Sequence, residues 1–311
     1  VMWFFIHPWR ARLTFDRAEI RWYLNYGKFV FATHGLGRTL QEFDDFWIGS
    51  SLGSLALGYY SKAYEFALYP RRIISDPLTR VVLPLFAKLQ DSRLQLSKAY
   101  FRFSSLVARL GFLFAGVMVL GAGDFVPIVL GEKWEPMVPT FQLMIPYVLL
   151  DPLLMVGANL SQAVGHPDFW ARARIIQVVA FIPAVIIGSQ IGGISGVALA
   201  TDAALIIGLV LLFLQNRRLV DISFQRMFGL PTVALLLGAT TSWQFSKILS
   251  TQSQLVHGSA RVLIFGCVYS AVLLVSESKE YLIHARRVWN LLMSETGLAR
   301  RTFESNEKMD I

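Results

Sequence analysis

The stretch from Ala56 to Gln90 places charged residues inside a sequence that is otherwise apolar enough for a membrane-spanning helix. At helical spacing its polar side chains form one stripe, made of Ser61, Glu65, Arg72, Asp76 and Arg80. A charge at the bilayer centre costs roughly 2.5 to 3.5 kcal/mol, so these charges and Arg71 could not all face lipid. The stripe is therefore expected to face a polar cavity, where Arg72 and Arg80 would partly neutralise Asp76.

Three prolines recur at every seventh position of the same stretch, at Pro70, Pro77 and Pro84. Each proline lacks an amide hydrogen and displaces the carbonyl four residues earlier. Within a membrane such a site is tolerated where protein or cavity water replaces the lost partner. Two interpretations remain open: the prolines only shape packing, or they allow a conformational change.

The composition is that of an integral membrane protein. Of the 311 residues, 54% are hydrophobic and only 16% are charged, whereas about a quarter of an ordinary soluble domain is charged. The net charge of +8 lies in short segments between apolar runs, which favours membrane topology over nucleic-acid binding. The single cysteine, Cys267, excludes an intrachain disulfide and a cysteine-based metal site.

The apolar runs predict an all-α, polytopic membrane helical bundle with about eight spans. Lys and Arg accumulate in alternate loops, and the opposite loops hold only Lys133, Lys247 and Arg261. The positive-inside rule then places the C-terminus in the cytoplasm. Gly192 and Gly196 have the spacing of a close helix contact. The expected spans are 22–52, 56–90, 103–121, 137–164, 175–187, 194–214, 227–249 and 256–275.

The first span carries a second polar face. Arg38 lies near its middle, so a cavity position is expected for this residue. Asp44 and Asp45 have an alternative explanation, because the helix could already have emerged into water there. Asp151 is an interior acid of the fourth span, and Asp202 is an acid of the sixth, with a capping or packing role as the alternative. The polar face consists of His34, Arg38, Gln41 and Asp45, with Glu42 beside it.

Sequence motifs of known enzyme classes are absent. The chain contains no nucleophile elbow, P-loop, zinc-protease helix or dinucleotide-binding loop. Its five histidines are scattered without the spacing of metal ligands. We therefore expect a protein that is not an enzyme and needs neither metal nor cofactor. Cationic and acidic side chains inside the membrane suit the binding and movement of a charged solute.

Four sequence segments carry a family resemblance. They are LGYYSKAYEFALYP with ISDPLTRVVLPLFAKLQD in 57–91, VLGEKW in 129–134, LSQAVGHP in 160–167 and GGISGVALAT in 192–201. In this order they resemble the Wzx-like polysaccharide flippases of the multidrug/oligosaccharidyl-lipid/polysaccharide exporter superfamily, in the colanic acid and exopolysaccharide branch. The resemblance implies two six-helix lobes around a central cavity, with two additional C-terminal helices.

On this comparison the chain supplies the second lobe. Residues 1–21 would connect the lobes, 22–214 form the second lobe, 215–275 the two additional helices, and 276–311 a cytoplasmic amphipathic helix and tail. The first lobe would be missing, and the apolar start of the chain (Val1–Ile6) is read as the end of an earlier segment.

The resemblance also implies a function. Such proteins move undecaprenyl-diphosphate-linked oligosaccharide across the bacterial inner membrane by alternating access. The expected partners are this substrate, membrane lipids and the polysaccharide polymerase machinery. Guanidinium groups bind phosphate oxygens in a bidentate manner, so the diphosphate would be bound by cavity arginines. The candidates are Arg38, Arg71, Arg72 and Arg80, with Glu65, Asp76, Asp45 and Asp151 as cavity acids or coupling residues.

Three alternative functions remain. A cation-coupled multidrug exporter of the same superfamily would be expected to have an acid-dominated cavity, whereas bases here at least equal acids. A membrane-embedded transferase acting on polyprenyl-linked sugars would need a His or Asp pair at the membrane surface. A scaffold of the polysaccharide assembly machinery would leave the buried charges unexplained.

Overall fold

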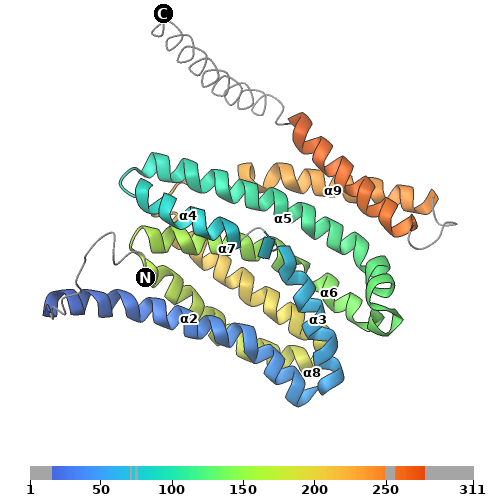
Figure 1. Cartoon of the computed structure of the whole chain (residues 1–311), viewed down its shortest axis with the longest axis horizontal. Helices are drawn as coiled ribbons and strands as arrows, with labels where there is room; N and C mark the ends of the chain where they lie inside the picture. Colours follow the sequence, from blue (N-terminus) through green and yellow to red (C-terminus); the bar gives the residue numbers. More distant parts are fainter. Residues whose placement is uncertain (1–15, 71, 74–75, 249–255, 277–311) are drawn as a thin grey trace, which may run out of the picture. The chain divides into compact units, whose positions relative to one another are not determined.

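The computed structural model describes residues 16–70, 72–73, 76–248 and 256–276, and its regular elements are helices (Figure 1). The predicted all-α membrane bundle is confirmed. The amphipathic helix expected after residue 276 and most of the connector 1–21 lie outside the described residues. The elements are α2 (Arg17–Ser51), α3 (Ser54–Pro70), α4 (Asp76–Leu89), α5 (Arg93–Leu130), η2 (Glu132–Met137), α6 (Val138–Leu143), α7 (Ile145–Ala163), α8 (Pro167–Asn216), α9 (Phe224–Ile248) and a last helix, Val256–Ser276.

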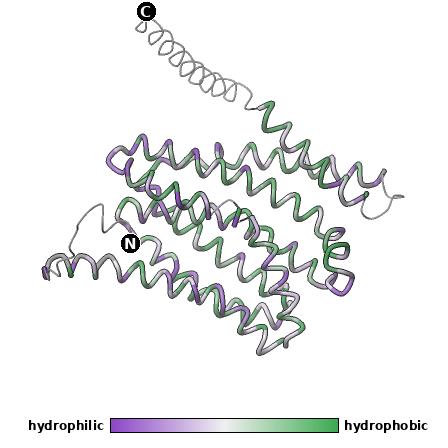
Figure 2. The backbone as a smooth tube through the Cα atoms, in the orientation of Figure 1, coloured by the Kyte–Doolittle hydropathy of each residue, from purple (hydrophilic) through white to green (hydrophobic). Residues whose placement is uncertain are grey.

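Three described helices are long and apolar enough to cross a membrane: α5, α8 and Val256–Ser276. A fourth candidate is the pair formed by Glu132–Leu143 and α7, which bends by 47°. Pro146, in the first turn of α7, lies at this bend, since its ring is compatible with a helix start but not with a continuing helix. The hydrophilic residues gather at turns such as the one between α4 and α5 (Figure 2). The chain is therefore a multi-pass membrane protein.

The continuous span expected from Ala56 to Gln90 is wrong. The structure has two helices there, because α3 ends at Pro70 and α4 begins at Asp76. Pro77 is the second residue of α4, a position where the missing amide hydrogen costs nothing, and Pro84 lies inside that helix. Two of the three prolines thus mark the boundaries of helices. The single stripe of charges assumed across 61–80 is interrupted at the same place.

Helix α8 is two antiparallel rods, which Figure 1 draws in yellow-green and yellow. They meet at Gly193, whose φ of 56° lies in the left-handed region that favours glycine. Gln177 of the first rod donates a hydrogen bond to the Ala204 carbonyl of the second, at 3.0 Å. The rods therefore account for the fifth and sixth predicted spans. Gly196 makes the predicted close contact, but its partner is Gly188, and no atom of another rod lies within 4 Å of a Cβ built at Gly192.

The chain divides into two compact units, one of residues 1–107 and 136–222 and one of residues 108–135 and 223–311. This division follows packing, and the predicted boundaries at 21, 214 and 275 stay a prediction. In the first unit α2 and α7 pack on α8, and α4 packs on α7. Its core contains Ile48, Tyr60 and Phe86, all fully buried. Trp47 of α2 donates a hydrogen bond to Ser189 of α8, at 2.9 Å.

In the second unit the later part of α5, α9 and the last helix pack around Phe265. This side chain is fully buried, and its ring lies against Gly116 and Gly238, neither of which has room for a Cβ. The Tyr269 hydroxyl donates a hydrogen bond to the Arg109 carbonyl, at 2.7 Å. Arg261 forms an ion pair with Asp124, at 3.5 Å. Small residues thus allow these helices to approach closely, as is common in membrane bundles.

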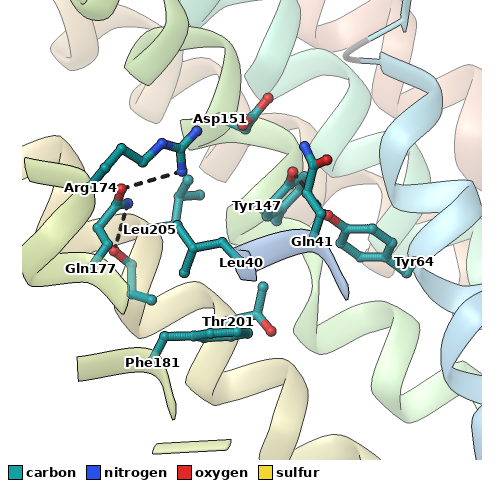
Figure 3. A pocket seen from close by; sticks show the side chains of 11 residues that line it. Leu40, Gln41, Tyr64, Tyr147, Asp151, Arg174, Gln177, Phe181, Thr201 and Leu205 are labelled. Carbon is teal, nitrogen blue, oxygen red and sulfur yellow. Dashed lines mark hydrogen bonds between the residues drawn. The ribbon is translucent and has the colours of Figure 1, made fainter. Parts of the chain in front are cut away.

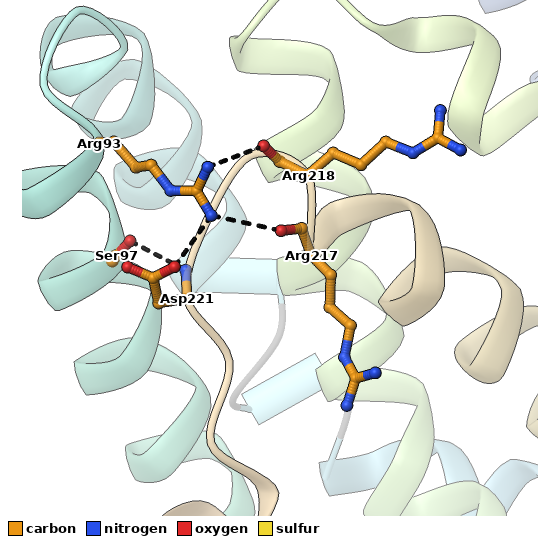
Figure 4. Close-up of polar contacts among 5 residues, drawn as sticks. All are labelled: Arg93, Ser97, Arg217, Arg218 and Asp221. Atoms are coloured by element: carbon orange, nitrogen blue, oxygen red, sulfur yellow. Dashed lines mark hydrogen bonds and ion pairs between the residues drawn. The ribbon is translucent and has the colours of Figure 1, made fainter.

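The connection that follows α8 is fastened to the first turn of α5 (Figure 4). Arg93 donates hydrogen bonds to the carbonyls of Arg217 and Arg218, at 3.5 and 3.4 Å, and forms an ion pair with Asp221, at 2.9 Å. The amide of Asp221 donates to the Ser97 hydroxyl, at 3.0 Å. A cation therefore satisfies carbonyls at the end of a helix, where the macrodipole is negative.

Arg93→Ala is expected to loosen this connection without unfolding the protein. The paired side chains of Arg93 and Asp221 are 56% and 74% exposed, so the loss of stability should stay below about 1 kcal/mol. Tryptic cleavage after Arg217 and Arg218 should become several-fold faster, as measured by mass spectrometry of the released peptides. Arg102→Ala, an exposed position of the same helix, is the matched control. Equal cleavage rates in both variants would show that Arg93 does not hold the connection.

Candidate functional site

The predicted polar face of α2 is largely exposed. Arg38 forms an ion pair with Glu42, at 2.6 Å, and their side chains are 75% and 59% exposed. His34 and Gln41 are also exposed, and Asp45 is half-buried. Asp44 is only 1% exposed, so the alternative that this acid has emerged into water is wrong. Asp44 is thus buried, although it directly precedes Asp45 of the predicted polar face.

An outer pocket of about 280 Å³ lies beside α2 and α3 and is lined by Gln41, Tyr64, Leu68, Arg72 and Asp76. The Arg72 guanidinium lies 5.8 Å from the centre of the Tyr69 ring. Two predicted site residues, Arg72 and Asp76, are thus brought together. Arg80 is exposed and does not line this pocket, and Arg71 lies outside the described residues.

The ion pairs expected along the stripe are replaced by others. Within the described part of the chain, no ion pair joins Asp76 to Arg72 or to Arg80. Glu65 instead pairs with Lys62, one turn earlier in α3, at 2.7 Å. Asp45 accepts a hydrogen bond from Ser61, at 3.1 Å. These two acids are therefore paired with residues other than the candidate arginines.

An inner pocket of about 40 Å³ lies among α2, α3, α7 and α8 (Figure 3). Asp151, which is 3% exposed, faces it from α7 as the sequence predicts for an interior acid. Arg174 reaches it from α8, and its guanidinium lies 4.2 Å from the centre of the Trp170 ring. Gln41 and Tyr64 line both pockets. The two pockets thus adjoin at Gln41 and Tyr64.

Arg174 was not predicted to be an interior residue. The basic segment GHPDFWARAR was expected to be a loop, with a span beginning only at Ile175. Helix α8 begins earlier, at Pro167, so Arg174 lies two turns inside it. The signal was present in the sequence, because Pro167 and Asp168 are typical residues of a first helical turn.

A buried hydrogen-bond network lies next to the inner pocket. The Tyr60 hydroxyl donates to Asp44, at 2.6 Å, and lies 3.2 Å from the Thr201 hydroxyl. The rings of Tyr60 and Tyr64 are stacked, with centres 6.3 Å apart, and the Tyr64 hydroxyl donates to Tyr147, at 3.3 Å. Asp202, the neighbouring acid in α8, is 4% exposed and lies inside the rod, away from its ends. Hydrogen-bonded polar side chains are thus buried between α2, α3 and α8 beside the pocket.

Part of the chain resembles known proteins. Residues 1–139 match the model of a family described as polysaccharide biosynthesis protein. The lipopolysaccharide biosynthesis protein WzxC of Escherichia coli is 30% identical over 204 residues, which cover 65% of this chain and 41% of WzxC. The chain is thus similar, over part of its length, to proteins of polysaccharide biosynthesis. The recognition predicted from the four sequence segments is thereby confirmed.

Two more relatives have names from polysaccharide biosynthesis, and one solved structure shares the fold. The amylovoran biosynthesis protein AmsL of Erwinia amylovora is 26% identical, over 61% of this chain and 50% of AmsL. The teichuronic acid biosynthesis protein TuaB of Bacillus subtilis is 26% identical, over 51% of this chain and 33% of TuaB. The lipid II flippase MurJ, in an inward closed conformation, has the same fold, with a TM-score of 0.71, 15% identity and coverage of 87% of this chain and 57% of MurJ. The chain spans half or less of the length of these curated relatives.

Proposed function

We propose that this chain is part of a flippase that moves undecaprenyl-diphosphate-linked oligosaccharide across the bacterial inner membrane during polysaccharide biosynthesis. The outer pocket is the observation that carries the proposal, because it places Arg72 beside Asp76, Gln41 and Tyr64. A guanidinium binds phosphate oxygens, whereas a carboxylate and an amide accept hydrogen bonds from sugar hydroxyls. This set of groups suits a sugar attached to a phosphate.

The exposed charges of α2 support the same proposal. An outward face that bears Arg38, Glu42 and Gln41 is costly against lipid, so it suits a wet cavity. The remainder of a longer protein would complete this cavity. Arg38, Arg71, Arg72 and Arg80 would bind the diphosphate, and Asp45, Glu65, Asp76 and Asp151 would balance the cations between substrates or carry coupling protons. Alternating access and a cytoplasmic C-terminus belong to this proposal.

The test is transport by the full-length protein in proteoliposomes. A fluorescent polyprenyl-diphosphate oligosaccharide should become accessible on the far leaflet, and Arg72→Gln should slow this by roughly tenfold to a hundredfold. That range corresponds to the loss of about 1.5 to 3 kcal/mol from one charge-assisted hydrogen bond. Lys98→Gln, at an exposed position of α5, is the control and should transport at the wild-type rate. Wild-type vesicles that move none of the labelled lipid would refute the proposal.

A further inference from the structure

Arg174 differs from the candidate arginines because its side chain is half-buried among the helices of the first unit. Arg38, Arg72 and Arg80 are exposed, whereas Arg174 is half-buried and lines the inner pocket. Its guanidinium lies over the Trp170 ring, which can stabilise a cation through the negative face of the ring. An arginine kept within an apolar bundle is costly, so a functional role is the default hypothesis for it.

The orientation of Arg174 is built by both rods of α8. Its guanidinium donates a hydrogen bond to the Gln177 side-chain oxygen, at 3.3 Å (Figure 3). Gln177 is 1% exposed, and its amide nitrogen donates to the Ala204 carbonyl on the other rod. A Cβ built at Gly208 would lie 2.0 Å from that nitrogen, so only glycine leaves room for the bridge. The guanidinium is therefore positioned before any ligand arrives.

The inner pocket is too small for a phosphate group in this conformation. Its volume of about 40 Å³ is enough for roughly three water molecules, since one water needs about 10 to 15 Å³ by this measure. Asp151 lines the same pocket, so its carboxylate and an anionic ligand would compete for the guanidinium of Arg174. Gln41 and Tyr64 line both this pocket and the outer pocket at Arg72, so the two pockets adjoin at these side chains.

We propose that Arg174 is a second anion-binding residue, which takes over the diphosphate group of the substrate once Gln41 and Tyr64, which line both pockets, move apart. The anion then competes with Asp151 for the guanidinium and gains charge-assisted hydrogen bonds in a region of low dielectric. Arg72 at the outer pocket and Arg174 at the inner pocket are two successive positions of one path. This inference rests on the proposed function and names the residue that completes its site.

The experiment measures the binding of inorganic pyrophosphate and of a short-chain prenyl-diphosphate sugar to the purified full-length protein. Arg174→Gln should weaken the binding of both at least tenfold, and Arg174→Lys should weaken it less. The control is Arg172→Gln, two residues away on the exposed side of α8 and paired with Asp168 at 3.2 Å. It should bind within twofold of the wild type.

Asp151→Asn separates anion binding from a structural role. Removal of the competing carboxylate should tighten pyrophosphate binding several-fold, whereas a merely structural pair would lose affinity in both variants. Wild-type affinity in Arg174→Gln, or weaker binding in Asp151→Asn, would overturn the role of Arg174. Failure of the proposed function looks different, because the wild-type protein would then translocate no lipid-linked sugar even where pyrophosphate binding still depended on Arg174.

Discussion

Gly196→Ala is expected to destabilise the protein by about 3 kcal/mol, at the upper end of the range for overpacking. A Cβ at this position would lie 2.0 Å from the Gly188 carbonyl oxygen and 2.7 Å from its carbon. Both atoms belong to the backbone, so no side chain can rotate away and the two rods of α8 must separate. Their separation would also move Gln177 away from the Ala204 carbonyl. The free energy of unfolding, measured by denaturant titration in mixed micelles, checks the result.

Gly192→Ala is the matched control for this prediction. No neighbouring atom lies within 4 Å of a Cβ built at Gly192, and its φ is not positive. The substitution should change the free energy of unfolding by less than about 1 kcal/mol, since alanine in place of glycine within a helix is neutral or stabilising. If both variants were equally stable, the two rods would not meet at Gly188 and Gly196.

Gly192 and Gly196 also show which part of the fold could be predicted from the sequence. The spacing of Gly192 and Gly196 indicated a close helix contact, and Gly196 does make one. Its partner, Gly188, could not be predicted, because the partner depends on where the chain reverses direction. The chain reverses at Gly193, which has a positive φ, but several other glycines in this region could adopt the same conformation. The apolar runs predicted the helices well, since burial in a membrane demands them. The ends of α3 and α4 near Pro70 and Pro77 were not predicted, because one continuous helix was expected there.

The candidate site was predicted in part for a similar reason. Helical spacing placed Arg72 and Asp76 on one stripe, and both residues line the outer pocket, although α3 and α4 are separate helices. Asp151 was correctly expected in the interior. Asp44 and Arg174 were not, because which of two adjacent acids points inward, and how early a helix begins, depend on tertiary packing. The binding roles of all these residues stay predictions.

Tyr60→Phe is expected to destabilise the protein by about 2 kcal/mol. The hydroxyl of this fully buried tyrosine donates a hydrogen bond of 2.6 Å to Asp44, which is 1% exposed. Its loss leaves a buried carboxyl oxygen without that donor, and a hydrogen bond to such a group contributes about 1.5 to 3 kcal/mol. Phenylalanine preserves the ring and its stacking on Tyr64, so the change in the free energy of unfolding reports the hydroxyl.

Tyr69→Phe, in the same helix, controls for the chemistry of the substitution. Tyr69 is 39% exposed, so water replaces whatever its hydroxyl contacts and stability should change by less than about 0.5 kcal/mol. Asp44→Asn in the Tyr60→Phe background tests the cause, because an amide costs less to bury than a carboxylate. This second change should restore part of the lost stability. A double variant as unstable as the sum of the two single variants would mean that Tyr60 and Asp44 contribute independently, and that the hydrogen bond between α2 and α3 is not what holds them together.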